Sequence, residues 1–305
     1  PLTSHKDPDM RYVVETANAV KKSLRQGQLV VLESTTYPGT TDEVVLPILE
    51  ESGLKLGTDF FLAFSPERED PGNKNFNTAT IPKVVGGVDH TSGTLAETLY
   101  LQAIEKVELV SSARAAEATK LTENIFRAVN IAMVNELKVI YEKMGINIWE
   151  VLDAAATKPF GFMRFNPGPG WGGHCIPLDP FYLTWKAKEY GIDTKFIGLA
   201  GEVNVHMPEY VVGKLGEALN ERCKPLKNSK VLILGVAYKK DIDDMRESPA
   251  LHIMEALEER GAQFDYHDPH ISSIPPTRQS PELTGKESVN LTAANIKSYD
   301  AVMVI

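Results

Sequence analysis

Short apolar runs alternate, in the first part of the chain, with stretches in which apolar residues recur every three or four positions. The runs occupy residues 29–32, 59–64, 83–87 and 106–110. Runs of this length predict buried strands, and the amphipathic stretches between them predict helices. Strands that alternate with helices are typical of a doubly wound parallel sheet, whose ligands bind beyond the carboxyl ends of the strands. We therefore predict a Rossmann-like parallel sheet over residues 1–111, with polar loops at 33–41 and 65–72 on its binding edge.

The middle of the chain has helical periodicity throughout. Residues 113–144 contain no proline and no internal glycine, and their spacing predicts one long helix. Further helices are expected at 148–156, after residue 180, and at 196–219, with an interruption near Pro208 because proline removes a backbone donor. We predict an all-helical central domain over residues 112–224, in which the long helix is a spine between domains or a dimer interface.

A third domain is predicted over residues 229–305. An apolar strand at 230–237 precedes Ser248 and Pro249, a pair that favours a helix start, and a second strand follows at 263–266. The strand–helix–strand order indicates a second Rossmann-like unit, with one glycine where a dinucleotide-binding turn has three. The charged loop at 238–247 suits a phosphate-bearing ligand, and a solvated charged loop is an equally good interpretation.

Composition narrows the class of protein. The 305 residues are 43% hydrophobic and 24% charged, with a formal net charge of −9, so nucleic acid or an anionic membrane is not expected as the main partner. No segment has the pattern of a membrane span or a signal peptide, and two cysteines outside any disulfide framework favour a reducing, cytoplasmic setting. Because the chain begins at Pro1 and stops within an apolar strand, we expect a fragment.

The strongest chemical candidate is the loop at 166–180, which is rich in glycine and proline and contains Cys175. Such a loop can approach a ligand closely, and the helix expected after it would favour a thiolate near its N-terminus. If a helical turn already starts at Ile176, Asp179 lies beside Cys175. A single cysteine is more often an inert buried side chain, but a core position does not need glycines on one side and an acid on the other.

Other candidates lie on the long helix and on the first polar loop. Lys120 and Asn124 are four residues apart and share a helix face, although a lysine on a helix is usually solvated. Amides at Asn124, Asn130 and Asn135 need partners if they are buried. For the hydroxyls of Ser34, Thr35 and Thr41, helix capping and turn formation are the commoner explanation of any single one. No spacing of Cys and His residues indicates a metal site.

Several motifs together resemble one family, the UDP-glucose/GDP-mannose 6-dehydrogenases. They are Ser34-Thr35-x-x-Pro38-Gly39-Thr40, Ser65-Pro66-Glu67-Arg68, Glu117-x-x-Lys120-x-x-x-Asn124, the loop from Gly168 to Pro180, and Gly235-x-x-Tyr238-Lys239-x-Asp241-x-x-Asp244-x-Arg246-x-Ser248-Pro249. The motifs follow the order of the family and span nearly the whole chain. Two segments are most similar to the subgroup that oxidises UDP-N-acetylhexosamines, UDP-N-acetylglucosamine in particular. They are Lys158-Pro159-Phe160-Gly161-Phe162 and the sequence of the loop that contains Cys175.

The resemblance implies an NAD-dependent, four-electron oxidation of a sugar primary alcohol to a carboxylate. Cys175 would add to the intermediate aldehyde, and a thioester formed by the second oxidation would be hydrolysed. Lys120 and Asn124 would stabilise the oxyanion, and Asp179, Thr35 and Glu67 would position or deprotonate water.

The same resemblance implies which residues hold ligands. The UDP-sugar would be bound by Glu67, Arg68, Lys120, Asn124, Asn166, Gly168, Gly170, Gly172, Tyr238 and Lys239. Ser34, Thr35 and Arg246 would approach NAD, and Arg164 would reach the substrate of a neighbouring subunit. A homodimer or larger homo-oligomer would assemble through the long helix.

One departure from the family affects cofactor binding. No G-x-G-x-x-G turn opens the first predicted sheet, and the family's first strand, that turn and the ribose-binding acid should precede Pro1. We therefore expect this chain to bind NAD more weakly than a member that contains them. The alternatives are a UDP-glucose 6-dehydrogenase, a non-catalytic UDP-sugar-binding and dimerisation module, and a cysteine hydrolase that uses His174 or His206, for which no orienting acid is evident.

Overall fold

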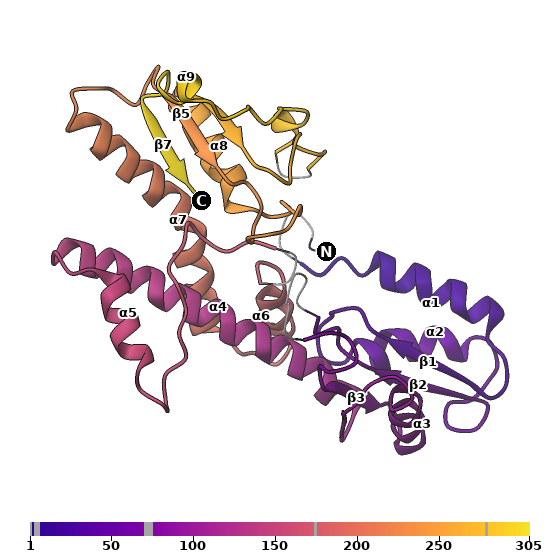
Figure 1. Ribbon diagram of the computed structural model, residues 1–305. Coiled ribbons are helices and arrows are strands. Elements are labelled where there is room, and N and C mark those ends of the chain that lie inside the picture. Colours follow the sequence, from indigo (N-terminus) through magenta and orange to yellow (C-terminus); the bar gives the residue numbers. More distant parts are fainter. Residues whose placement is uncertain (1, 3–6, 70–75, 174–175, 278–279) are drawn as a thin grey trace. The chain divides into compact units, whose positions relative to one another are not determined.

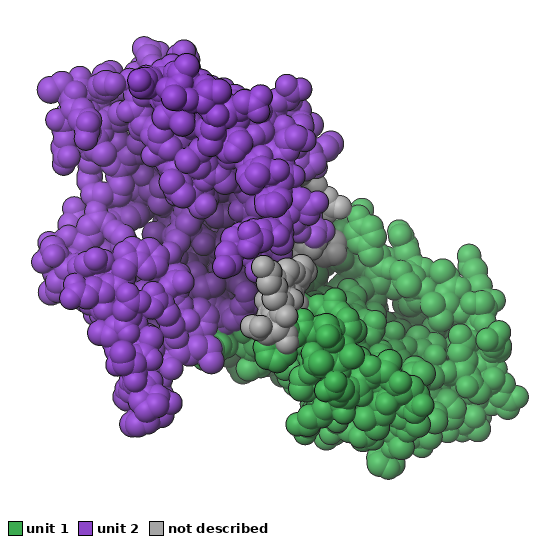
Figure 2. All heavy atoms as spheres, viewed as in Figure 1, with its two compact units in different colours: residues 1–126, 178–194 green, residues 127–177, 195–305 purple. Residues whose placement is uncertain are grey.

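A computed structural model describes residues 2, 7–69, 76–173, 176–277 and 280–305 (Figure 1). The chain divides into two compact units, each with most of its contacts within itself (Figure 2). The first contains residues 1–126 and 178–194, and the second contains residues 127–177 and 195–305. The division into three domains at 1–111, 112–224 and 229–305 stays a prediction.

The first unit is built on a four-stranded sheet in the order β1-β2-β3-β4. Its elements are α1 (Arg11–Ser23), β1 (Gln28–Leu32), a π-helical turn η1 (Thr41–Val45), α2 (Leu46–Glu50), β2 (Phe60–Phe64), β3 (Lys83–Gly87), α3 (His90–Tyr100), β4 (Val107–Val110), the first part of α4 (Ala113–Lys143) and α6 (Asp179–Glu189). Strand β2 consists wholly of apolar residues, and Phe60, Leu62 and Phe64 are fully buried, as expected for a strand covered on both faces.

The expectation of an all-parallel first sheet is wrong for its central pair. Strands β1 and β2 are parallel, and so are β3 and β4, but β2 and β3 are antiparallel, with Ala63 opposite Gly87. A parallel connection needs a crossover, usually a helix. The described residues between β2 and β3 contain no helix, so the chain returns beside β2 in the opposite direction.

The second unit combines helices with a three-stranded parallel sheet in the order β6-β5-β7. Its elements are the rest of α4, α5 (Ile148–Ala156), α7 (Lys195–Asn220), β5 (Lys230–Leu234), α8 (Pro249–Glu259), β6 (Gln263–His267), a 3-10 turn η2 (Pro281–Leu283), α9 (Ala293–Ile296) and β7 (Ala301–Val304). Ser248 caps α8 by accepting a hydrogen bond from the Ala250 amide, as its sequence predicted. Buried residues of β5, α8 and β6 form the core.

The expected interruption of the helix near Pro208 does not occur. Helix α7 is continuous from Lys195 to Asn220 with Pro208 inside it. Proline cannot donate to the carbonyl four residues earlier, which belongs to Asn204. A Cβ atom at position 170 would lie 3.0 Å from that carbonyl oxygen, but Gly170 has no Cβ. The backbone of the loop therefore packs next to the Asn204 carbonyl, which receives no hydrogen bond from Pro208.

Candidate active site

Helix α4 presents three buried polar side chains in its first half. Glu117 is fully buried, and Lys120 and Asn124 are 8% and 4% exposed. Residues three, four and seven apart lie on one face of a helix, so the three side chains share a stripe. A stripe of this kind in a buried setting requires hydrogen-bond partners, because unpaired buried polar groups are costly.

Lys120 and Asn124 each contact a segment that contains another predicted site residue. The Lys120 ammonium donates to the backbone carbonyl of Glu67, in the loop that follows β2. The Asn124 side-chain amide donates to Asp179 Oδ2 at 2.5 Å. The structure thus brings together Lys120, Asn124, Asp179 and the backbone of Glu67, whose side chain is exposed. An ammonium has three N–H donors and an amide has two, so both retain donors for a ligand.

Asp179 is the first residue of α6 and is 3% exposed. Burial raises the pKa of its carboxyl from the ordinary value of 3.8 to about 6, while the hydrogen bond from Asn124 and the charge of Lys120 act in the opposite direction. A carboxyl with a pKa near 6 is ionised at neutral pH and is a better proton acceptor than an ordinary aspartate. The group is therefore suited to general base catalysis.

Residues 176–178 form a turn, and α6 begins only at Asp179. The condition under which Asp179 would lie beside Cys175, a helical turn that already starts at Ile176, is therefore not met. Pro177 precedes the helix, and Pro180 lies in its first turn, where proline is tolerated because the backbone N–H there has no helical acceptor. His174 and Cys175 lie outside the described residues.

Glu117 was not assigned a role from the sequence. Its Oε2 accepts a hydrogen bond from the Gly39 amide at 2.6 Å, and its Oε1 accepts from the Thr41 amide at 2.9 Å and the Thr41 hydroxyl at 2.6 Å. Burial raises the pKa of this carboxyl, and the three donors work against that effect. The sequence did contain a sign that Glu117 is buried. It lies one turn before Lys120 and between alanines, which predict a buried helix face.

The hydroxyl-rich segment that Glu117 contacts follows the carboxyl end of β1. Within it Ser34 is exposed, Thr35 is half-buried and Thr36 is 2% exposed. The Thr36 hydroxyl is buried and has no hydrogen-bond partner among the described residues. The carboxyl edge of parallel strands is where nucleotide ligands bind in sheets of this type. An unpaired hydroxyl at that edge fits a polar ligand group.

Arg68 is held against α4 by Glu123. Its guanidinium pairs with the Glu123 carboxylate at 2.7 Å and donates to the carbonyl of Pro82 at 2.5 Å. The two ionic side chains are 27% and 35% exposed. A guanidinium has five N–H donors, so these contacts orient the Arg68 side chain without using all of its hydrogen-bond donors.

In the second unit, two buried amides hold the start of the glycine-rich loop. Asn135 on α4 accepts from the Gly168 amide at 2.9 Å and donates to Asn204 on α7 at 2.8 Å. Asn204 in turn donates to the carbonyls of Ala128 and Ala200 at 3.2 and 3.0 Å. Asn135 and Asn204 are 0% and 1% exposed, so the prediction that buried amides find partners is confirmed for Asn135. Asn204 was missed, because nothing in the sequence distinguishes it from other helix amides.

The other end of this loop packs against the segment after β5. The Gly173 amide donates to the carbonyl of Arg246 at 3.2 Å. A side chain added at Gly172 would begin 2.8 Å from Tyr238 Cβ, and one added at Gly173, where φ is +85°, would begin 2.8 Å from the Tyr238 ring. The glycines therefore allow the loop backbone to lie directly on Tyr238, which the sequence had predicted as a ligand residue.

The remaining predicted ligand residues lie near this packed loop. Asn166 is exposed and accepts from Arg164 Nε at 3.0 Å, and Lys239 is half-buried. Arg246 is exposed and pairs with Asp244 at 2.6 Å. Asp241 and Glu247 have φ values of +61° and +53°, a left-handed conformation that such residues rarely adopt. Left-handed backbone of this kind is often found at binding sites.

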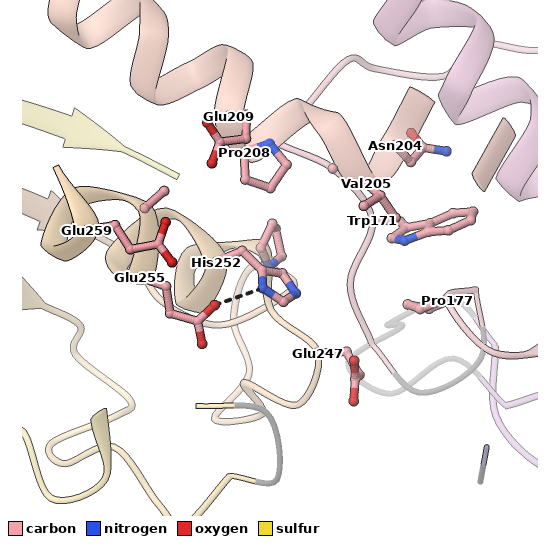
Figure 3. A pocket seen from close by; sticks show the side chains of 13 residues that line it. Trp171, Pro177, Asn204, Val205, Pro208, Glu209, Glu247, His252, Glu255 and Glu259 are labelled. Atoms are coloured by element: carbon pink, nitrogen blue, oxygen red, sulfur yellow. Dashed lines mark hydrogen bonds and ion pairs between the residues drawn. The ribbon is translucent and has the colours of Figure 1, made fainter. Parts of the chain in front are cut away.

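The glycine-rich loop, α7 and α8 together line a cavity of about 240 Å³ (Figure 3). Its lining includes Trp171, Pro208 and His252, and His252 contacts Glu255 at 3.2 Å. The other acidic residues of the lining are Glu209, Glu247 and Glu259. Four carboxylates disfavour a phosphate group, so this cavity does not suit the UDP moiety.

Among the described residues, no group of three or more His, Cys, Asp or Glu side chains could hold a metal ion. None of the helices in the described ranges is both long and apolar enough to cross a membrane.

Comparison with known proteins identifies three consecutive matches to one family. Models of the UDP-glucose/GDP-mannose dehydrogenase family match residues 1–104 (NAD binding domain), 114–206 (central domain) and 232–305 (UDP binding domain). A UDP-N-acetyl-D-glucosamine 6-dehydrogenase of Pseudomonas aeruginosa is 39% identical over 90% of this chain and 65% of its own length. The corresponding protein of Salmonella typhi is 34% identical over 100% of this chain and 70% of its own length.

The fold agrees with a solved structure of the same group. A UDP-D-ManNAc dehydrogenase of Pyrococcus horikoshii superposes with a TM-score of 0.89 at 33% identity, over 100% of this chain and 68% of that one. The chain spans about 65% of the length of the Pseudomonas relative. Matches to all three domains, in order and over most of the chain, establish the family and its α/β, Rossmann-like architecture. The chain belongs to the UDP-glucose/GDP-mannose dehydrogenase family.

Proposed function

We propose that the protein is an NAD-dependent nucleotide-sugar 6-dehydrogenase that oxidises the C6 alcohol of a UDP-N-acetylhexosamine, with UDP-N-acetylglucosamine as the first substrate to test. The observation that supports it best is the cluster of Lys120, Asn124 and Asp179, which combines oxyanion donors with a base whose pKa is near 6. Relatives named as UDP-N-acetyl-D-glucosamine 6-dehydrogenases favour this substrate over UDP-glucose.

The proposed reaction uses the residues of the chain as follows. Asp179 accepts the proton of the C6 alcohol, directly or through water. Lys120 and Asn124 donate hydrogen bonds to the oxygen as it gains negative charge. The Cys175 thiolate adds to the C6 aldehyde to form a thiohemiacetal, and after the second oxidation the thioester is attacked by water, which releases the carboxylate and the thiol. When bound, NAD accepts one hydride in each of the two oxidations.

NAD fits the described residues at one edge of the first sheet. The buried Thr36 hydroxyl, which has no hydrogen-bond partner in the part of the chain that the structure describes, lies in the segment after β1, beside the predicted cofactor residues Ser34 and Thr35. Arg246 is our further candidate for NAD, and its exposed guanidinium would have to share its donors between the cofactor and Asp244.

The UDP-sugar is assigned to the loop at 166–172 together with Tyr238, Lys239 and Arg68. Close packing of Gly172 and Gly173 on Tyr238 supports this assignment, because it presents loop amides and an aromatic ring on one surface. Backbone amides and basic side chains are suitable donors for a diphosphate. Glu67, with its exposed carboxylate, is proposed to position water or a sugar hydroxyl.

A homodimer or larger homo-oligomer is also part of the proposal. Large apolar side chains are exposed on α4, α5 and α7 of the second unit, namely Met133, Ile140, Trp149, Phe196, Leu199 and Val205, and Met144 directly after α4 is exposed as well. Apolar surface of this extent is typical of protein interfaces. Sedimentation analysis of the wild-type protein and of Phe196→Glu, whose side chain is 80% exposed, tests it: a dimer is expected for the first and a monomer for the second.

The decisive experiment measures NADH formation. The 305-residue chain and the whole gene product that contains it are incubated with NAD and, in separate reactions, UDP-N-acetylglucosamine, UDP-N-acetylmannosamine and UDP-glucose. Two NADH per UDP-N-acetylhexosamine are expected, and Cys175→Ser should form no acid. UDP-sugar binding by calorimetry without NADH from any substrate would favour a non-catalytic binding module instead.

A further inference from the structure

We propose that Glu117 is a positioning residue that fixes the hydroxyl-rich loop, residues 34–41, to helix α4 and so sets the place of the cofactor residues relative to Lys120. The part of this inference that concerns NAD rests on the proposed function. The anchoring itself rests only on the geometry of the first unit.

The contact is made to the backbone of the loop. The two oxygens of the Glu117 carboxylate accept from the Gly39 amide, the Thr41 amide and the Thr41 hydroxyl, at 2.6 to 2.9 Å. Glu117 and Thr41 are both fully buried, and Gly39 is buried. A contact of this kind, with three donors and no water access, is demanding in geometry, because each donor lost leaves a buried group unpaired.

The anchor requires a carboxylate rather than an amide. All three partners donate, and only a carboxylate accepts with both oxygens. A glutamine would turn its NH₂ group toward the Gly39 amide or toward Thr41, so one donor would face another. The two amides also lie where the helical segment of η1 and α2 begins, a place that favours negative charge.

Other contacts hold the side chains that follow this loop. Arg114 pairs with Asp42 at 2.6 Å, and Lys186 on α6 pairs with Glu43 at 2.7 Å. These ion pairs fix the start of the helical segment from outside, whereas Glu117 fixes its backbone from within. The loop therefore depends on Glu117 at the point nearest to Ser34 and Thr35.

The position of Glu117 on α4 gives the anchor its functional meaning. Glu117 and Lys120 are one turn apart on the same face, so a single helix carries the proposed oxyanion donor and the anchor of the cofactor loop. A loss of the anchor should move the loop while leaving Lys120 bound to the Glu67 carbonyl. Cofactor use should then weaken more than UDP-sugar binding.

The first test is hydrogen exchange of the protein without NAD or substrate. In Glu117→Gln, the amides of Gly39 and Thr41 should exchange at least about tenfold faster than in the wild type, while the β2 amides change little. Thr41→Val, which removes one donor, should show a smaller increase, and Thr41→Ser, which keeps the hydroxyl, should restore protection. Leu49→Ala, a fully buried residue of α2 outside these contacts, is the control for general destabilisation.

The second test is kinetic. Glu117→Gln should raise the KM for NAD about tenfold and change the KM for the UDP-sugar less than twofold, whereas Leu49→Ala should shift neither KM. Unchanged exchange at Gly39 and Thr41, or exchange raised evenly as in Leu49→Ala with both KM values unaltered, would overturn the proposal. If Glu117→Gln does not fold, the Thr41→Val and Thr41→Ser pair decides. If the wild type forms no NADH, the proposed function fails while the exchange test still judges the anchor.

Discussion

Helix α4 contains two buried polar networks that differ in chemical character. In its first half, Glu117, Lys120 and Asn124 each contact a different segment of the first unit, and Asn124 pairs with Asp179. Burial raises the pKa values of two acids in this network, Glu117 and Asp179. In its second half, Asn135 forms a network of neutral amides with Asn204 of α7. Both are shielded from solvent, and both satisfy hydrogen-bonding groups of a loop.

The difference shows what each network can do. Neutral amides hold a backbone at any ordinary pH, because neither side chain titrates. Ionisable groups in a buried site change charge within a range that burial shifts toward neutrality, so they can accept or supply protons. The first network is suited to chemistry and the second to holding the glycine-rich loop, and replacing members of each should separate these roles.

The largest effect is expected from Lys120→Ala. Removal of an oxyanion donor should lower kcat by about 10² to 10³ with little change in the affinity for UDP-sugar. Asn135→Ala, from the second network on the same helix, should instead raise the KM for UDP-sugar, because Gly168 loses its anchor. Steady-state kinetics with calorimetric binding separates them; equal losses of kcat and affinity in Lys120→Ala would point to plain binding.

Asn204→Leu should lower the free energy of unfolding by about 3 kcal/mol, since it leaves the buried Asn135 side-chain amide without its acceptor and removes the side-chain hydrogen bonds to the carbonyls of Ala128 and Ala200. Because amides do not titrate, the loss should be the same at pH 5.5 and 8.5. Urea denaturation at both pH values measures it. Val205→Ala, next to it but 52% exposed, is the control and should change stability little.

Asp179→Asn tests the titration of the first network. The native pKa of about 6 lies above the ordinary 3.8, so the folded state binds more protons between these values and stability falls as pH rises through this window. At pH 7.5 the variant should be more stable than the wild type by up to about 3 kcal/mol, and at pH 3.5 the difference should vanish. Turnover should be lost. If the difference in the free energy of unfolding between variant and wild type is the same at pH 7.5 and pH 3.5, Asp179 does not titrate with a raised pKa.

The smallest effect is expected at the rim of the first network. Glu123→Gln removes the ion pair with Arg68, whose side chains are both partly exposed, and should change the free energy of unfolding by less than about 1 kcal/mol. The change should decrease further in high salt. A loss comparable to that of Asn204→Leu would show that this pair belongs to the buried network.

Most elements were predictable from local pattern. The apolar run of β2, the long α4 without proline and the Ser248–Pro249 start of α8 were all predicted from spacing and residue type. The two errors of fold have a common cause. The direction of β3 and the continuity of α7 through Pro208 depend on neighbours distant in sequence, which local propensity does not report.

Local sequence pattern was sufficient to predict the alternation of strands and helices, the helix face shared by Lys120 and Asn124, and the loop that needs glycine, because each follows from period or from backbone freedom. It could not predict that Asn124 contacts Asp179, that Glu117 holds residues 39–41 or that Asn204 supports Asn135, because these contacts arise from the fold. These contacts join residues 55 to 78 positions apart. A buried group finds its partner by packing across such distances, and no local pattern encodes which of several polar side chains it will meet.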